Sequence, residues 1–274
     1  MNLTSSSIDQ PIFFIRQGVG QPVLLIHGIA ASHADWEGLS SELVKAGFEA
    51  IALDLPGHGN SGMPEKPDLI NLEIVFDTLV EWIRTLKLTT PPFFVGHSLG
   101  GYLALEYALH FPEQTRGMVL IDPYYSPFQI PYLVRVGYRE NLIFAAARRK
   151  IPDRFYDLLV ETTSFLNPGR YVLRHDLPQY VRRQMAENFR RASPGIFKLP
   201  FTARNLEPYL PQIHSPTLVI YGTRDSTLRP RSFGNLVTHL SHAQGIGIKA
   251  GHVPHQSNAD ETNRTILDFF KKLV

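Results

Sequence analysis

The stretch Phe93-Phe94-Val95-Gly96-His97-Ser98-Leu99-Gly100 decides the fold of this chain. Its first three residues form a short apolar run typical of a buried strand, and residues 101–111 have the apolar periodicity of a helix. Ser98 is therefore predicted at the tip of a strand-to-helix turn, where its backbone adopts strained angles. Gly96 and Gly100 flank it because a Cβ atom at either position would collide with the strand or the helix.

Composition excludes several kinds of site. The 274 residues contain no cysteine, which rules out disulfides, thiolate metal sites and a cysteine nucleophile. The net charge is only +2 and the one basic tract is Arg148-Arg149-Lys150, so no nucleic-acid partner is indicated. His, Asp and Glu residues nowhere have the sequence spacing of metal ligands, and we expect neither a metal nor a cofactor.

The N-terminal residues 1–7 have no basic start and no long apolar run, and nowhere in the chain do eighteen apolar residues follow one another. We therefore expect a cytoplasmic protein that does not bind a membrane and acts on a small molecule.

Strands and helices alternate along most of the chain, with a change in the middle. From 123 to 211 the short apolar runs disappear, and the residues favour helices interrupted by prolines. Strands are predicted at 12–16, 23–27, 48–53, 93–95, 118–121, 216–222 and 245–249, and helices at 36–46, 72–86, 101–110, 231–240 and 262–273.

Four separate motifs together resemble the α/β-hydrolase fold superfamily. They are Gly96-His97-Ser98-Leu99-Gly100-Gly101, His27-Gly28 upstream of it, and Asp225 and Gly251-His252 downstream. The resemblance covers nearly the whole chain apart from residues 123–211. It implies an α/β fold in which helices flank a mostly parallel sheet of eight strands.

The resemblance also implies how the chain is divided. Residues 1–122 and 212–274 would form the hydrolase core, and residues 123–211 would be an inserted helical cap, or lid. The cap segment is rich in aromatic residues and carries fourteen Lys and Arg against seven Asp and Glu, whereas the rest of the chain has thirteen against eighteen. The excess of positive charge can be explained by a basic surface exposed to solvent. Alternatively, the positive charge steers anionic substrates toward the site.

A serine hydroxyl is a weak nucleophile at neutral pH unless a base removes its proton and a carboxylate orients that base. The order Ser98, Asp225, His252 is the nucleophile-acid-base order that this fold uses. Asp225 follows one buried strand and His252 follows the next, so both side chains would project from the sheet edge that carries Ser98.

Each assignment of acid and base has a rival. Asp122 ends the strand after the serine helix, where some family members carry the acid. We favour Asp225, because Gly-x-x-Asp after the penultimate strand is the commoner pattern and Asp122 could serve as a cap for the inserted segment. His255 could replace His252 as the base, but the Gly251-His252 pair matches the family pattern.

The resemblance implies a backbone oxyanion hole. The amide of Ile29, which follows His27-Gly28, would supply one donor, and the amide of Leu99, at the start of the serine helix, would supply the other.

Other polar residues near these motifs are interpreted as structural. We expect His27 to brace the loop that carries Ile29, and Asp54 and His58 to belong to a glycine-rich turn rather than to a catalytic pair. His97 lies next to the nucleophile, but its side chain points away from it and is predicted to pack.

The leading hypothesis is a serine carboxylesterase that acts through an acyl-enzyme on Ser98, with a moderately apolar ester as substrate. An anionic ester is the alternative that the basic cap segment allows. A serine at this turn argues against the family's dehalogenases and epoxide hydrolases, which need an aspartate nucleophile. Alternatives that keep the triad are cleavage of a carbon–carbon bond, hydrolysis of a lactone or thioester, and perhydrolysis. A further alternative is a small-molecule receptor with a slow or vestigial triad.

Overall fold

The structure is a computed structural model that describes residues 11–62, 70–130, 177–225, 227–228 and 230–274. Its described part contains a sheet of seven strands in the order β1-β3-β2-β4-β5-β6-β7. β1 runs antiparallel to β3, and the other neighbouring pairs are parallel. The strands are β1 (Phe14–Gln17), β2 (Gln21–Ile26), β3 (Phe48–Leu53), β4 (Phe93–His97), β5 (Gly117–Ile121), β6 (Thr217–Gly222) and β7 (Ala243–Ile248).

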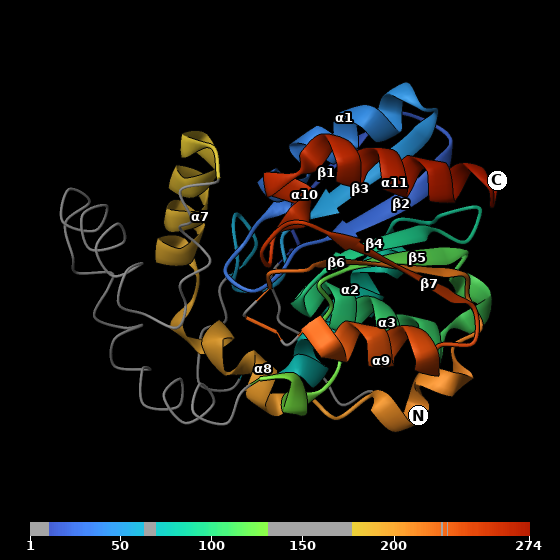
Figure 1. The fold of residues 1–274 in the computed structure, drawn as a ribbon. Coiled ribbons are helices and arrows are strands. Elements are labelled where there is room, and N and C mark those ends of the chain that lie inside the picture. The colour runs from blue at the N-terminus through green and yellow to red at the C-terminus, as the bar shows by residue number, and fades with distance from the viewer. Residues whose placement is uncertain (1–10, 63–69, 131–176, 226, 229) are drawn as a thin grey trace.

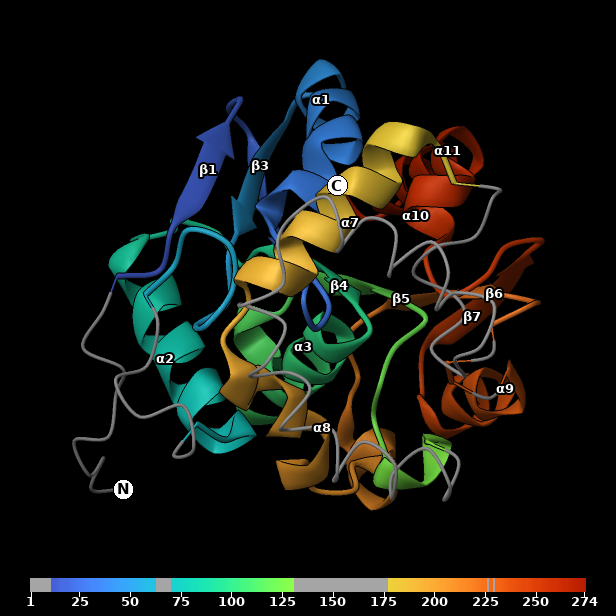
Figure 2. The same cartoon turned by 90° about the vertical axis from the view of Figure 1, so that its left-hand side faces the viewer.

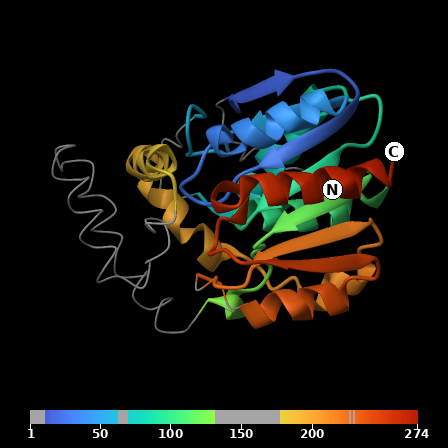
Figure 3. The same ribbon diagram turned by 45° about the horizontal axis from the view of Figure 1, so that its top comes forward.

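Helices connect the strands and cover both faces of the sheet (Figures 1 and 3). The α-helices are α1 (Glu37–Lys45), α2 (Leu72–Thr85), α3 (Leu99–His110), α7 (Gln179–Arg191), α8 (Leu199–Thr202), α9 (Pro230–His239), α10 (Pro254–Ser257) and α11 (Ala259–Lys271). The 3-10 helices are η1 (His33–Trp36), η3 (Pro112–Gln114), η4 (Pro127–Gln129), η6 (Pro194–Lys198) and η7 (Glu207–Gln212).

The family resemblance implies eight strands, whereas the described residues contain seven. The sequence itself marks seven strand-like runs, and each of them is found with its ends shifted by at most two residues. The eighth strand rested on the resemblance alone and had no apolar run of its own in the described segments. The predicted helices of the core are also found, with similar bounds.

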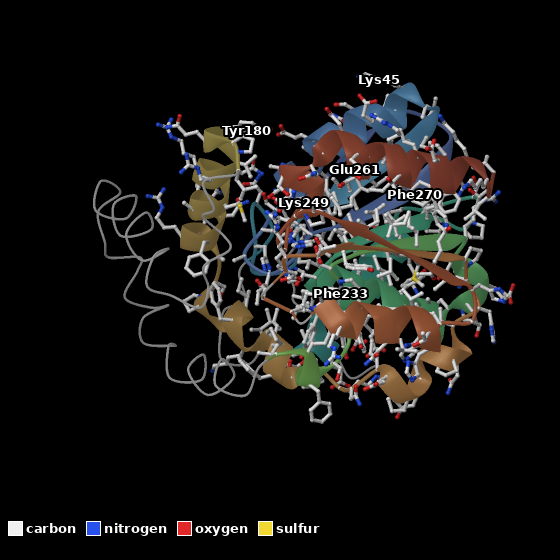
Figure 4. All side chains as sticks on the ribbon, viewed as in Figure 1. Lys45, Tyr180, Phe233, Lys249, Glu261 and Phe270 are labelled. Carbon is white, nitrogen blue, oxygen red and sulfur yellow. The ribbon has the colours of Figure 1, made fainter. Side chains whose placement is uncertain are left out.

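The central strands are apolar on both faces because helices cover both faces. In β2, Leu24 and Ile26 belong to the core under α2, α3 and α9, whereas Val23 and Leu25 belong to the core under α1 and α11. Figure 4 shows the two layers through Phe233 of α9 and Phe270 of α11, which lie on opposite sides of the sheet. This sandwich fixes the strand ends, from which the site is built.

The described part of residues 123–211 contains α7, α8 and the 3-10 helices η4, η6 and η7, and α7 lies beyond the carboxyl ends of the parallel strands (Figures 1 and 2). Gln184 of α7 donates a hydrogen bond to Asp35 at 3.1 Å. Farther along the segment, Arg204 holds the buried Glu106 of α3 with two hydrogen bonds of 2.7 and 2.6 Å. Residues 131–176 lie outside the described residues, and a cap domain over 123–211 stays a prediction.

None of the helices in the described ranges is long and apolar enough to cross a bilayer.

Candidate active site

Ser98 lies at a strained turn between β4 and α3. Its φ of 48° and ψ of −109° are values that a residue with a Cβ atom rarely adopts. The backbone is held by three hydrogen bonds: Ser98 N donates to the Ile121 carbonyl at 3.0 Å, and the Ser98 carbonyl accepts from Tyr102 N and Tyr124 N. A Cβ atom on Gly100 would collide with the carbonyl oxygen of Ile26, so glycine is what lets α3 start against β2.

Asp225 and His252 come together in the loops that follow β6 and β7. His252 Nδ1 lies 2.8 Å from Asp225 Oδ2, and the other carboxylate oxygen accepts from the backbone N–H groups of Thr227 and Leu228 at 2.8 and 3.1 Å. A carboxylate can only accept, so Nδ1 carries the proton and Nε2 keeps a lone pair. The two loops meet because Gly222 has no Cβ to collide with the Gly251 carbonyl.

His97 does more than the packing that the sequence suggested. Its Nε2 donates to the backbone carbonyl of His252 at 2.8 Å, and the two rings are 4.9 Å apart between centroids. Burial lowers the pKa of His97 well below its usual value, so the ring is neutral and donates through Nε2. His97 therefore ties the loop carrying His252 to the end of β4, one residue before Ser98.

The loop after β2 lies beside the serine. A Cβ atom on Gly28 would be 2.7 Å from His97 Nδ1 and 3.4 Å from the Cβ of Ser98, so the backbone just before Ile29 runs against the turn. His27 braces this loop as expected, because its Nδ1 donates to the Gly28 carbonyl at 2.6 Å and its Nε2 accepts from Leu55 N at 2.9 Å.

Leu99 is the other residue whose amide the sequence predicted at the site. It is the first residue of α3, so its N–H belongs to the helix turn that has no acceptor within the helix. The positive end of the helix dipole adds to this donor.

Asp54 is the centre of the glycine-rich turn, as predicted, and its partner is a residue that sequence analysis missed. His33 donates to Asp54 Oδ1 from its backbone N at 2.6 Å and from its ring Nδ1 at 2.9 Å, and Asn60 N donates to Oδ2 at 2.8 Å. Burial opposes ionisation of Asp54, but the hydrogen bonds from His33 and Asn60 outweigh it and lower the pKa. His58 is bonded to the Pro56 carbonyl, and burial lowers its pKa to about 3.

His255, the rival base, is buried between aromatic rings, with the ring of His97 4.6 Å away between centroids. Its ring stacks on Trp36 with centroids 4.8 Å apart, and neither ring nitrogen has a hydrogen-bond partner among the described residues. Burial lowers the pKa of His255 to about 3. A histidine with no carboxylate to orient it does not meet the requirement for a catalytic base, which His252 meets.

Asp122, the rival acid, is completely buried next to Asp225. One oxygen of Asp122, one oxygen of Asp225 and one ring nitrogen of His252 all lie within 4.8 Å of one another. Sequence spacing could not reveal this group, because its members are far apart in the chain. His252 Nδ1 and Asp225 Oδ2 are already bonded to each other, so we assign the group to hydrogen bonding rather than to a cation.

The chain is similar to known proteins over most of its length. A family model described as the alpha/beta hydrolase fold matches residues 21–259. Among solved structures, a thermophilic esterase from Thermogutta terrifontis superposes with a TM-score of 0.78, covering 96% of this chain and 94% of its own at 24% identity. At that identity the likeness extends to the fold alone.

Curated relatives match along nearly the whole chain. The abhydrolase domain-containing protein abhd-5.2 of Caenorhabditis elegans is 37% identical over 96% of this chain, which spans 61% of that relative's length. A 2-hydroxy-6-oxononadienedioate/2-hydroxy-6-oxononatrienedioate hydrolase of Comamonas testosteroni is 29% identical over 92% of this chain and 88% of its own. A pimeloyl-[acyl-carrier protein] methyl ester esterase of Vibrio atlanticus is 26% identical over 97% of this chain and 100% of its own.

Proposed function

The chain belongs to the alpha/beta hydrolase fold family, and within that family we propose that it is a serine hydrolase of carboxylic esters. Ser98 is the nucleophile, His252 the general base and acid, and Asp225 the carboxylate that orients His252. The amides of Ile29 and Leu99 form the oxyanion hole.

The observation that carries this proposal is the 2.8 Å contact between His252 Nδ1 and Asp225 Oδ2, in a loop that His97 ties to the serine turn. The contact selects the tautomer whose free Nε2 can take a proton, and the base of a serine hydrolase needs this form. The positive φ of Ser98 is a second support, because strain of this kind is retained where the fold uses the residue.

The reaction follows from these roles. Ser98 Oγ attacks the acyl carbon while His252 Nε2 accepts its proton, and the oxyanion binds the amides of Ile29 and Leu99. The imidazolium then protonates the departing alcohol, which leaves an acyl-enzyme ester on Ser98. Water deprotonated by His252 hydrolyses that ester, releases the acid and restores the serine.

The proposal is tested with p-nitrophenyl esters of graded acyl length. We expect wild-type turnover, and we expect Ser98→Ala to lose about 10⁴-fold or more in kcat, leaving only the residual contribution of binding and the oxyanion hole. Ser41→Ala is the matched control, because Ser41 is exposed on α1 and bonds only its own helix. A fluorophosphonate probe should label the wild type and not Ser98→Ala. Ester turnover that survives in the variant would refute the mechanism.

A second substrate class is favoured by the Comamonas testosteroni relative, whose name specifies an oxo-dienedioate substrate. The same triad could hydrolyse a carbon–carbon bond in a vinylogous diketone. Carbon–carbon hydrolases of this fold usually have a tryptophan soon after the catalytic histidine, and this chain has Val253-Pro254-His255 instead. We therefore propose esters as the preferred substrates. Measuring kcat/KM for a vinylogous diketone beside the esters decides between the two substrate classes.

A further inference from the structure

Asp122 is a buried carboxyl group that the proposed mechanism does not use. It directly follows the last residue of β5 and has a φ of 41°, and its side chain is completely buried. Its backbone N donates to the Ile220 carbonyl at 2.9 Å, and its Oδ1 accepts from Gly222 N at 2.8 Å. These two bonds to β6 fix the direction in which the carboxyl group points, which is toward Asp225.

The remaining oxygen of Asp122 has an unusual neighbour. No donor among the described residues reaches Oδ2. A carboxylate oxygen of Asp225 lies within 4.8 Å of an oxygen of Asp122. The two oxygens of Asp225 already accept from Thr227 N, Leu228 N and His252 Nδ1. Two ionised carboxylates in contact in a buried site repel each other, and they attract only when one of them carries a proton.

We propose that Asp122 is held as a neutral carboxylic acid whose Oδ2–H donates a hydrogen bond to the Asp225 carboxylate, and that it acts as a positioning residue for the Asp225–His252 pair. This inference rests on the proposed function of that pair. With the proton on Asp122, the cluster carries one negative charge, which Asp225 bears. Asp225 then accepts hydrogen bonds from Asp122 as well as from Thr227 N and Leu228 N, so its Oδ2 stays directed at His252 Nδ1.

The electrostatics support the same arrangement. Burial, followed by the charge of Asp225, raises the pKa of Asp122 well above its usual value. Among the described residues, Asp225 and His252 each place a polar side-chain atom within 4.8 Å of a carboxyl oxygen of Asp122. Of the two carboxyl groups, Asp225 is the one with a hydrogen bond to the imidazole and two from backbone N–H groups, so the charge belongs there.

Two substitutions of Asp122 test whether it acts as a neutral hydrogen-bond donor or as an ionised acid. Asp122→Asn keeps an acceptor for Gly222 N and an N–H donor for Asp225, so we expect kcat within about threefold of wild type. We also expect the apparent pKa in the pH profile of kcat/KM to stay unchanged. Asp122→Ala removes the donor and should lower kcat about tenfold or more. An Asp122→Asn variant as inactive as Asp225→Asn, or a folded Asp122→Ala variant with wild-type kcat, would overturn the inference.

Infrared difference spectroscopy tests the proton without relying on turnover. The wild-type-minus-Asp122→Asn spectrum at neutral pH should contain the C=O band of a protonated carboxyl group, since other carboxyls cancel. Absence of that band overturns the inference even if Asp122→Ala does not fold. The two proposals can fail separately. If the band is present but Ser98 is not labelled by fluorophosphonate and no ester is hydrolysed, the proposed function is wrong, whereas the inference that Asp122 is protonated still holds.

Discussion

Two aspartate–histidine pairs lie in loops that follow strands of the same sheet. After β3, Asp54 Oδ1 is 2.9 Å from His33 Nδ1; after β6, Asp225 Oδ2 is 2.8 Å from His252 Nδ1. Both carboxylates are buried, and both histidines are bonded through the same ring nitrogen. The local chemistry of the two pairs is almost the same, so their different roles must come from what surrounds them.

Both carboxylates also accept hydrogen bonds from two backbone N–H groups, those of His33 and Asn60 at Asp54 and those of Thr227 and Leu228 at Asp225. The surroundings differ elsewhere. His252 lies in a loop bonded to His97, the residue before the strained Ser98, and Asp225 faces a second carboxyl group at Asp122. An aspartate–histidine contact alone is therefore not an active site. It becomes a candidate when a nucleophile is fixed beside it.

The largest predicted difference between the pairs is in catalysis. Asp225→Asn should lower kcat about 10⁴-fold, because the amide favours the wrong tautomer of His252. Asp54→Asn should lower kcat by at most about tenfold, because Asp54 acts on the site only through the loop that carries Ile29. Kinetics with one p-nitrophenyl ester measures both. Equal losses in the two variants would show that the pairs are not functionally distinct.

The second difference concerns stability. Asp54→Ala leaves the N–H groups of His33 and Asn60 without their acceptor, and we expect it to lower the free energy of unfolding by about 2–4 kcal/mol. Urea unfolding measures the change, with the exposed Asp268→Ala as a control expected to stay within about 0.5 kcal/mol. A loss as small as that of the control would mean that the turn does not depend on Asp54.

The smallest effect is a pH dependence at the Asp54 pair. The hydrogen bond to Asp54 raises the pKa of His33, so His33 binds its proton more tightly in the folded state. Its contribution to stability is therefore fully present below the unfolded pKa of about 6.5 and is lost as the pH rises through the raised value. The free energy of unfolding of wild type should exceed that of His33→Ala by about 1 kcal/mol at low pH, with a smaller excess at high pH. A difference that grows with pH would contradict this sign.

The sequence predicted the parts of the fold that depend on neighbours along the chain. The apolar run before Gly96 and the periodicity after it give β4 and α3, and seven apolar runs give seven strands. The carboxyl-end rule for parallel strands was enough to bring Asp225 and His252 to the same edge. The sequence also predicted that His27 braces its loop and that Asp54 belongs to a glycine-rich turn.

Contacts between distant segments were decided only by the tertiary structure. The bond of His97 to the His252 carbonyl joins residues 155 positions apart, and that of Asp122 to Gly222 joins residues 100 positions apart. These contacts depend on the register of neighbouring strands and on how closely their loops approach, and no local pattern encodes either. The sequence by itself therefore determined which residues could do chemistry. Packing of the strand ends determined which partners each of them has, because hydrogen bonds act over about 3 Å and chain neighbours do not set such distances.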